Sequence, residues 1–438
     1  MEIFEKILAI IFSLFILCNA LILKKIFKTW LIPATIFSLF WFVYTFLPLT
    51  ILYFVPINPW AIGFIAICVT LFSLSSLAFK WETAFKLNSL KQNPTNVFNY
   101  SFLNKIHIIT FILAIISILL LILSQGFTLA DLVLNFYKVS SKFTANRYAQ
   151  KIEYSVFSKI GLSLSYICAL LGGLIWALTK SKKKIYITLL FSFLPAILVM
   201  LYQSSKGMLF IALFLFLGSI YIIKLYQKEI KLLTFANYIK LARYIIIIIP
   251  IVIISFMVRG LYKLNSTETI FDILIKKFAS YTFGHLYAFS DWFTYYTNGT
   301  SVINYNAETF TLGKYTFTTF WRIVDPEMII LQGTFNEFYK YKDVLKTNIY
   351  TIYRGLITDF GIIGTLTFII FTSYFIHLFY YKILCTKKQM FLLGMLPFLL
   401  ASFYISYIIS ILTWNVIPFT YFIFIIILYA NKLTFIKR

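Results

Sequence analysis

The chain has 438 residues, of which 61% are apolar and 12% are charged, and its mean hydropathy is +0.87. This composition excludes a water-soluble globular protein. The formal net charge of +24 does not indicate nucleic-acid binding, because the lysines cluster at the ends of apolar runs, where membrane topology explains them.

Long apolar runs recur from end to end, and each could cross a bilayer as a helix of ~20 residues. The sequence therefore predicts an all-α polytopic membrane protein with one integral membrane domain over residues 1–438. No cleaved signal peptide is expected, because Lys24 and Lys25 follow a full-length span without a small-residue cleavage pattern. The four cysteines form no disulfide or metal-binding pattern. The eleven expected spans are 3–23, 30–54, 59–79, 106–125, 155–179, 185–203, 207–224, 244–262, 355–381, 390–411 and 413–431.

Basic clusters occupy alternate connections between the spans, for example Lys24–Lys28, Lys180–Lys184 and Lys224–Arg243. The positive-inside rule makes these connections cytoplasmic and places the N-terminus outside and the C-terminus inside. A re-entrant segment elsewhere would instead place the N-terminus inside. The outer face then carries a smaller loop over 126–154 and a large loop over 263–354.

Acidic residues and arginines both favour the outer face. Nine of the fifteen Asp and Glu residues lie between Glu268 and Asp359, while the span interiors are almost free of charge. Six arginines stand against thirty-three lysines, in a composition that suggests AT-rich codons. Arginines kept against that bias indicate sites that need a planar fork for phosphate or carboxylate, although each could also be a membrane anchor. The four outer arginines are Arg147, Arg259, Arg322 and Arg354.

The large outer loop is rich in aromatic residues. Phe271–Lys277 predicts a short helix, and Tyr281–Tyr296 predicts an amphipathic helix along the membrane surface. Its rings could form an interfacial belt or a platform on which sugars stack. Turns are expected at Asn298-Gly299 and near Asp325-Pro326, where Asp325-Pro326-Glu327 only superficially resembles a metal-binding pair.

The chain re-enters the membrane through Asn348–Gly355, followed by Asp359-Phe360-Gly361 and Gly364. Arg354 is expected at the outer mouth of a span, with Asp359 about 7.5 Å deeper at the helical rise. The two could form a structural ion pair, or Arg354 could bind phosphate at the mouth of a cavity. Gly361 and Gly364 would let a helix or lipid chain approach closely.

These features resemble the Wzy-type polymerases of O-antigen repeat units. The resemblance covers the many spans, the late outer loop and an exit of the form N-x-Y-T, R-G, D-F-G and G. Ser204-Ser205-Lys206-Gly207 is similar to the basic turn of such polymerases, with Lys206 where arginine is commoner. Arg322 is separated by ten residues from Gly333, as in the R-x10-G pattern, whereas Arg147 has Ser158 at the matching place.

The resemblance implies a GT-C-like glycosyltransferase of the bacterial inner membrane that needs no metal or cofactor. It would polymerise undecaprenyl-diphosphate-linked oligosaccharides into O-antigen or capsule-type polysaccharide on the periplasmic side. Expected partners are these substrates, membrane lipids and a chain-length regulator, and not nucleic acid. The implied diphosphate contacts are Arg322, Arg354, Arg259, Arg147 and Lys206. The candidate bases are His285, Glu308 and Asp359, and the candidate sugar-stacking residues are Tyr287, Trp292 and Trp321. His285 could equally be a structural hydrogen-bonder.

Two alternatives stay open. An O-antigen ligase would share the plan and the lipid donor but deliver glycan to lipid A-core. A flippase or transporter would move the lipid-linked oligosaccharide intact, although the long outer loop and uncharged spans argue against transport.

Overall fold

The computed structural model describes residues 2–87, 93–148, 156–179, 181–203, 206–226, 270–306, 308–325, 335–386 and 389–436. The chain divides into two compact units. The first contains Met1–Asn88, Ile275–Thr386 and Ser402–Trp414, and the second contains Ser89–Leu274, Lys387–Ala401 and Asn415–Arg438.

Nine helices within the described ranges are long and apolar enough to cross a membrane. The prediction of a multi-pass helical membrane protein is therefore confirmed, and each of these helices overlaps one expected span. The span expected at 390–411 is instead a shorter helix, α16 (Met390–Ile405), followed by the 3-10 helix η4 (Ile411–Thr413). The span expected at 244–262 lies outside the described residues. The nine helices are α1 (Glu2–Phe27), α2 (Pro33–Ile51), α3 (Pro59–Leu74, extended by η1, Ser75–Ala78), α5 (Tyr100–Ser124), α8 (Val156–Leu178), α9 (Lys182–Gln203), α10 (Lys206–Tyr226), α15 (Ile352–Cys385) and α17 (Val416–Ile436).

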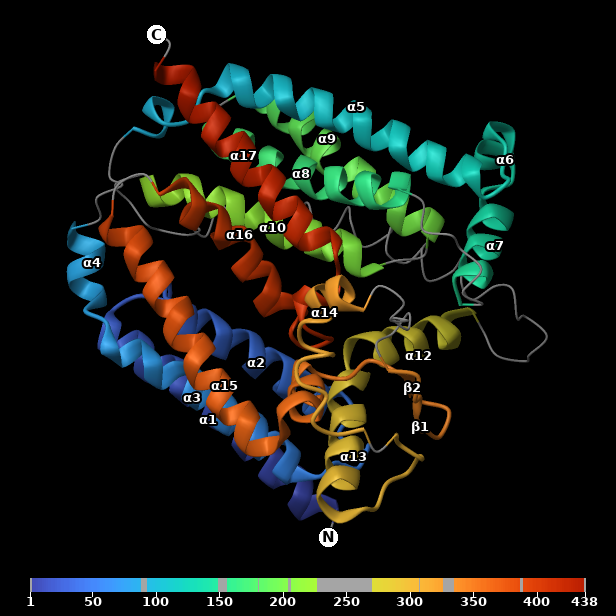
Figure 1. The fold of residues 1–438 in the computed structure, drawn as a ribbon. Coiled ribbons are helices and arrows are strands. Elements are labelled where there is room, and N and C mark those ends of the chain that lie inside the picture. Colours follow the sequence, from blue (N-terminus) through green and yellow to red (C-terminus); the bar gives the residue numbers. More distant parts are fainter. Residues whose placement is uncertain are drawn as a thin grey trace. The chain divides into compact units, whose positions relative to one another are not determined.

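In the first unit, α1, α2 and α3 pack together and α15 lies along α3 (Figure 1). The short helix α4 (Trp81–Leu87) packs near the C-terminal end of α15. Small polar side chains join the helices where their backbones approach. Ser13 and Thr45 share a hydrogen bond of 2.7 Å between hydroxyl oxygens, and Asn19 donates to the hydroxyl of Ser73 at 2.8 Å. Such pairs hold apolar helices in register, because lipid offers no competing partner.

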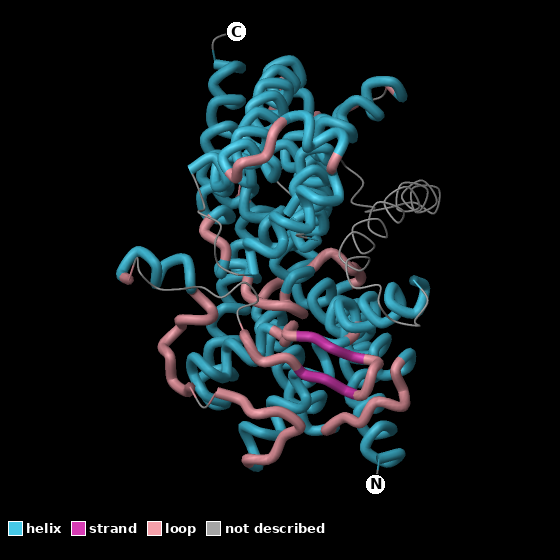
Figure 2. Tube along the Cα trace, turned by 90° about the vertical axis from the view of Figure 1, so that its right-hand side faces the viewer, coloured by secondary structure: helices cyan, strands magenta, loops and turns pink. Residues whose placement is uncertain are grey.

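The segment before α15 contains helices α12 (Ile270–Thr282), which belongs to this unit from Ile275 on, α13 (Gly284–Asn298) and α14 (Thr318–Val324). The two helices expected near 271–277 and 281–296 are thus present, and Gly299 ends α13 in the left-handed region at φ 71°. The sequence analysis did not predict the antiparallel hairpin of β1 (Tyr339–Tyr341) and β2 (Leu345–Thr347), drawn in magenta in Figure 2. Each strand has only three residues, too few to show an alternating pattern.

The position of α13 differs from the expected one. We expected an amphipathic helix along the membrane surface, but residues 284–290 are all buried and the helix packs against α2 and α3. The aromatic side chains of α13 up to Phe293 therefore fill the interior of the first unit and do not form an open platform. A continuous run of aromatics around a helix fits burial on most sides, as here, better than a surface position.

The second unit is built around α8, which packs against α5, α9, α10 and α17. Gly173 allows α10 to approach closely, because a Cβ atom there would lie 2.3 Å from the carbonyl oxygen of Phe216. The loop expected at 126–154 contains α6 (Leu129–Leu134) and α7 (Phe136–Tyr148). A capping box between Thr128 and Asp131 begins α6.

Candidate functional site

Arg354 lies in the first turn of α15 and is 3% exposed. The backbone N–H of the preceding Ile352 donates to the carbonyl of Ser406 at 2.9 Å, which fixes the start of the helix. A guanidinium keeps its charge in a protein, so burial requires partners for its five N–H groups. The surroundings of Arg354 therefore define the most unusual polar site in the first unit.

Four aromatic rings surround the guanidinium. Its central carbon lies 3.8 Å from the ring centroid of Phe335, 4.1 Å from Tyr350, 5.2 Å from Tyr305 and 5.5 Å from Trp292. The rings attract the cation through their quadrupoles and shield it from water. We call Arg354 with these four residues the arginine box. It combines α13, the segments near 305 and 335, and the residues just before α15.

One carboxylate partly neutralises the box. Glu337 Oε1 lies 3.0 Å from Nη2 of Arg354 and also accepts from the backbone N–H of Asn306 at 3.1 Å. Nε and Nη1 of Arg354 have no hydrogen-bond partner among the described residues. Buried polar groups in proteins are nearly always paired, so these two nitrogens keep the capacity to donate to further acceptor oxygens.

The tyrosines of the box add no negative charge. Burial raises the pKa of Tyr350 to about 12, and it raises the pKa of Tyr305 still further above the ordinary value. Both phenols are therefore neutral at physiological pH. Carboxylates and any bound anion are left to balance Arg354.

A second carboxylate approaches the box through a tyrosine. The ring of Tyr315 stacks on the outer side of Phe335, with centroids 5.2 Å apart and planes 14° from parallel. The Tyr315 hydroxyl donates to Oε2 of Glu308 at 2.8 Å, and Glu308 is exposed. Of the three candidate bases, Glu308 is the one that can meet an incoming hydroxyl without rearrangement of the core.

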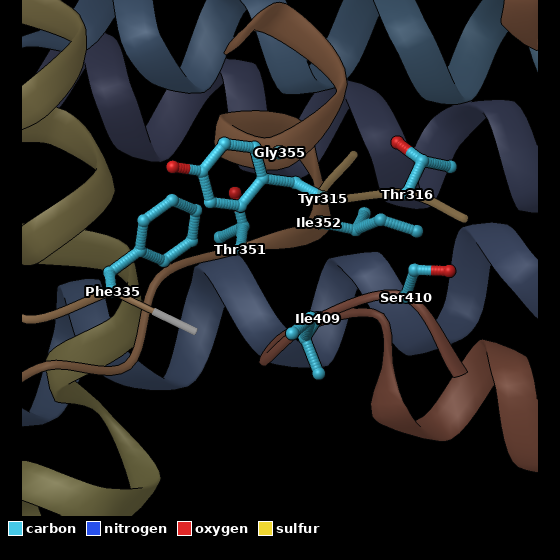
Figure 3. A pocket seen from close by; sticks show the side chains of 8 residues that line it. All are labelled: Tyr315, Thr316, Phe335, Thr351, Ile352, Gly355, Ile409 and Ser410. Atoms are coloured by element: carbon cyan, nitrogen blue, oxygen red, sulfur yellow. The ribbon is translucent and has the colours of Figure 1, made fainter. Parts of the chain in front are cut away.

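A small hollow adjoins these rings. Figure 3 shows Tyr315 and Phe335 beside one another, with the 409–410 segment across the hollow. Phe335 thus belongs both to the lining of the hollow and to the arginine box. The eight lining residues are Tyr315, Thr316, Phe335, Thr351, Ile352, Gly355, Ile409 and Ser410.

Asp359 has a different role from the one expected. It does not pair with Arg354, because residues five apart on a helix point to different faces. Its Oδ1 accepts from the Thr311 hydroxyl at 2.5 Å and the Tyr315 N–H at 3.0 Å. Its Oδ2 accepts from the Thr316 N–H at 2.7 Å and the Thr316 hydroxyl at 2.6 Å. The fully buried carboxylate anchors the loop that carries Tyr315, so Asp359 is a positioning residue.

The helix breaks directly after this anchor. Gly361 has φ 69° and ψ 178°, a conformation that is essentially restricted to glycine. The break exposes carbonyls of the preceding turn, and the N–H groups of Thr311 and Leu312 donate to the carbonyls of Thr358 and Asp359, each at 3.2 Å. We expected Gly361 to admit a neighbouring helix or a lipid, and the structure instead docks this loop there.

His285 is also placed differently from a catalytic base. It is fully buried, and its Nε2 lies 3.1 Å from the carbonyl oxygen of Tyr44. A carbonyl only accepts, so Nε2 carries the proton. Burial lowers the pKa of His285 to about 4, which keeps the ring neutral. The structure supports the structural alternative for this histidine.

The aromatic residues expected to stack on sugars fall into three different settings. Tyr287 is 1% exposed and donates to the carbonyls of Pro48 and Leu52, so it offers no face to a sugar. Trp292 is 3% exposed and forms one wall of the arginine box. Trp321 is half-buried on α14, and its indole N–H donates to the carbonyl of Leu312 at 3.2 Å.

The remaining basic candidates lie on other elements or outside the described residues. Arg322 is half-buried on α14 of the first unit. Lys206 is 9% exposed at the start of α10, and Arg147 lies on α7, both in the second unit. Arg259 lies outside the described residues, as do Pro326, Glu327 and Gly333. The arginine box therefore contains one of the five predicted diphosphate contacts, Arg354.

Sequence reasoning missed five residues of this site, which are Tyr305, Tyr315, Phe335, Glu337 and Tyr350. The signal available was weak: an acid between two phenylalanines in Phe335-Asn336-Glu337-Phe338, in the same loop as two arginines. Comparisons of the chain with protein-family models, with curated proteins and with solved structures find no match.

Proposed function

We propose that the protein is a glycosyltransferase that polymerises lipid-diphosphate-linked oligosaccharide repeat units, with the arginine box as the diphosphate site. The observation that carries this proposal is the buried Arg354, whose Nε and Nη1 lack partners among the described residues while a carboxylate holds Nη2. An arginine that is already desolvated and shielded by rings binds phosphate oxygens more strongly than one in water. The resemblance to Wzy-type polymerases and the multi-pass helical fold support the same reading.

The proposed reaction needs one acid–base group and one anion stabiliser. The acceptor sugar hydroxyl oxygen bonds to the anomeric carbon, and the bond from that carbon to the diphosphate oxygen breaks. The diphosphate leaves with the electron pair, and Arg354 stabilises the charge that develops on its oxygens. Glu308 takes the proton of the attacking hydroxyl. The growing chain passes from its carrier to the acceptor unit, and no cofactor enters the balance.

Glu337 occupies the position that a phosphate oxygen would take. Its side chain is 17% exposed, so it can move away from Arg354 towards solvent. Exchange of one carboxylate for a diphosphate with several oxygens would satisfy the nitrogens that the resting protein leaves unpaired. In this proposal Glu337 keeps the buried guanidinium neutralised until substrate arrives.

The test is elongation of a purified lipid-linked repeat unit by the protein in liposomes, with products resolved by length. We expect longer chains from the wild type and at least about a 100-fold slower rate from Arg354→Lys, since an ammonium cannot bind oxygens along a planar fork. Lys340→Gln removes a cation at an exposed position of β1 outside the box and should keep its rate.

Three results would overturn the proposal. Intact substrate that crosses the bilayer without elongation would indicate a flippase. Transfer to lipid A-core and never to a second repeat unit would indicate a ligase. Equal rates for Arg354→Lys and Lys340→Gln would remove the arginine box from the chemistry.

A further inference from the structure

The segment 310–324 carries large apolar side chains that the described residues leave exposed. Leu312 is 71% exposed, Phe310 64%, Ile323 75% and Val324 78%. Phe320 on α14 is also exposed, at 49%. Monomeric proteins in water rarely keep so many large apolar groups together on one short element. The segment therefore needs an apolar environment.

The backbone of this segment is unusually well satisfied for a loop. Besides the two bonds at the helix break, Lys314 N donates to Thr311 O at 3.2 Å and Phe317 N to Gly313 O at 2.7 Å. The N–H groups of Tyr315 and Thr316 are taken by the Asp359 carboxylate. A loop in water can leave such donors to solvent, whereas backbone polar groups that approach hydrocarbon must be paired within the protein. The polar groups turn inward and the apolar side chains outward.

The apolar face of the segment continues onto a membrane-spanning helix. Phe310 lies against Gly361, where a Cβ atom would be 3.0 Å from its ring. Beyond the break, Phe317 meets Phe368 with ring centroids 5.8 Å apart. The same stretch of α15 exposes Ile363 at 80% and Phe371 at 63%, as a lipid-facing surface does. The segment and the spanning helix thus share one apolar surface.

We propose that residues 310–324 insert into the bilayer and contact lipid acyl chains, with Phe310, Leu312, Ile323 and Val324 as the inserted side chains. Lys314 and Trp321 lie on the same segment, and a cation and an indole among apolar residues are typical of the headgroup level. The phosphate headgroups of the bilayer match Lys314 and Trp321, and its acyl chains match the four apolar side chains. This inference holds whether or not the protein is a polymerase.

The test uses spin labels in the full-length protein in liposomes. A background of Cys18→Ala and Cys385→Ala removes the two accessible cysteines and keeps the buried Cys68 and Cys168. Labels at Leu312→Cys and Ile323→Cys should collide with oxygen more often than with a water-soluble nickel complex. A label at Ile363→Cys, on the lipid-facing surface of α15, should show the same preference and is the positive control. Val302→Cys is the matched control, because Val302 is also apolar and 67% exposed but sits in a polar turn held by Asp291.

Leu312 and Ile323 labels that match Val302 would place the segment in water and overturn the proposal. Labels inaccessible to both reagents would also overturn it, since they would indicate a protein partner. A second measurement avoids cysteine variants. The contribution of Trp321 to the tryptophan fluorescence is the difference between the wild type and Trp321→Phe. Brominated acyl chains should quench this contribution, and its persistence would contradict insertion.

Discussion

The Nε2 atom of His285 lies 3.1 Å from the carbonyl oxygen of Tyr44, four residues before Pro48 in α2. A proline has no N–H, so Pro48 leaves this carbonyl without its helical donor. The imidazole replaces the missing donor from another helix. Tyr287, also on α13, donates to the Pro48 carbonyl at 2.9 Å, so α13 fits onto the polar defect that the proline creates.

We expect His285→Ala to destabilise the protein by about 1–3 kcal/mol, because the Tyr44 carbonyl becomes a buried orphan. His285→Gln should recover part of this loss, since an amide nitrogen reaches a position similar to Nε2. Thermal unfolding in detergent micelles checks both variants. Elongation per folded molecule should stay close to wild type, whereas loss of turnover in a folded His285→Gln protein would restore the histidine as a base.

The pH dependence of stability should also report on His285. Its pKa is about 4 in the folded protein against an ordinary value of 6.5, so the unfolded chain binds the proton first. Stability is therefore unaffected above pH 6.5 and falls as the pH drops towards 4, by up to about 3 kcal/mol. The melting temperature of the wild type should decline more steeply over this window than that of His285→Gln. Parallel curves would contradict burial of a neutral ring.

Asp359→Asn should detach the loop that carries Tyr315. In this variant an amide nitrogen replaces one acceptor oxygen and faces N–H or hydroxyl donors. We expect the free energy of unfolding to fall by about 2–4 kcal/mol. Thr316→Val is the milder control, because it removes a single hydroxyl donor. Limited proteolysis should cut near 310–317 faster in Asp359→Asn than in Thr316→Val. Equal protection would show that the carboxylate does not anchor the loop.

Gly361→Ala should lower stability by about 1–3 kcal/mol, because the backbone conformation at Gly361 excludes a side chain. Gly207→Ala is the matched control in a helix, where a Cβ atom meets nothing within 4 Å. We expect a change below about 1 kcal/mol there. Equal melting temperatures for the two variants would mean that α15 continues through Gly361 unbroken.

Glu337→Gln should make the arginine box more receptive to anions. Loss of the paired carboxylate leaves a buried cation and lowers stability by about 2 kcal/mol. Added pyrophosphate should then raise the melting temperature of Glu337→Gln more than that of the wild type, because binding to the folded state stabilises it. Glu308→Gln, in contrast, should keep the wild-type response to pyrophosphate and lose about 100-fold in elongation rate. The same pyrophosphate shift in Glu337→Gln and in the wild type would exclude Glu337 as the competing anion.

Much of the fold is legible in the sequence. A spanning helix satisfies its own backbone hydrogen bonds, so a sufficiently long apolar run determines it without help from the rest of the chain. The same local logic predicted the helices near 271–277 and 281–296 and a turn at Asn298-Gly299, where α13 ends. The kink at Gly361 could not be predicted from the sequence, since glycine permits the conformation but does not require it.

The candidate site was legible only in part. Arg354 stood out because arginine is rare in this chain and this one opens a spanning helix. Its partners Glu337, Phe335 and Tyr305 did not, because they come from segments whose meeting depends on how the loop before α15 folds back. Asp359 and His285 were expected to be bases, since sequence shows a titratable group but not the hydrogen bonds that occupy it.

By itself, the sequence determined a multi-pass helical membrane protein with an aromatic, acid-rich loop, because hydropathy and local backbone rules act along the chain. Only the tertiary structure decided that aromatic rings surround Arg354, that Asp359 anchors a loop and that His285 supplies the hydrogen-bond donor that Pro48 lacks in α2. These outcomes depend on burial and on partners distant in sequence. Both are set when the segments pack and are not encoded at any single position.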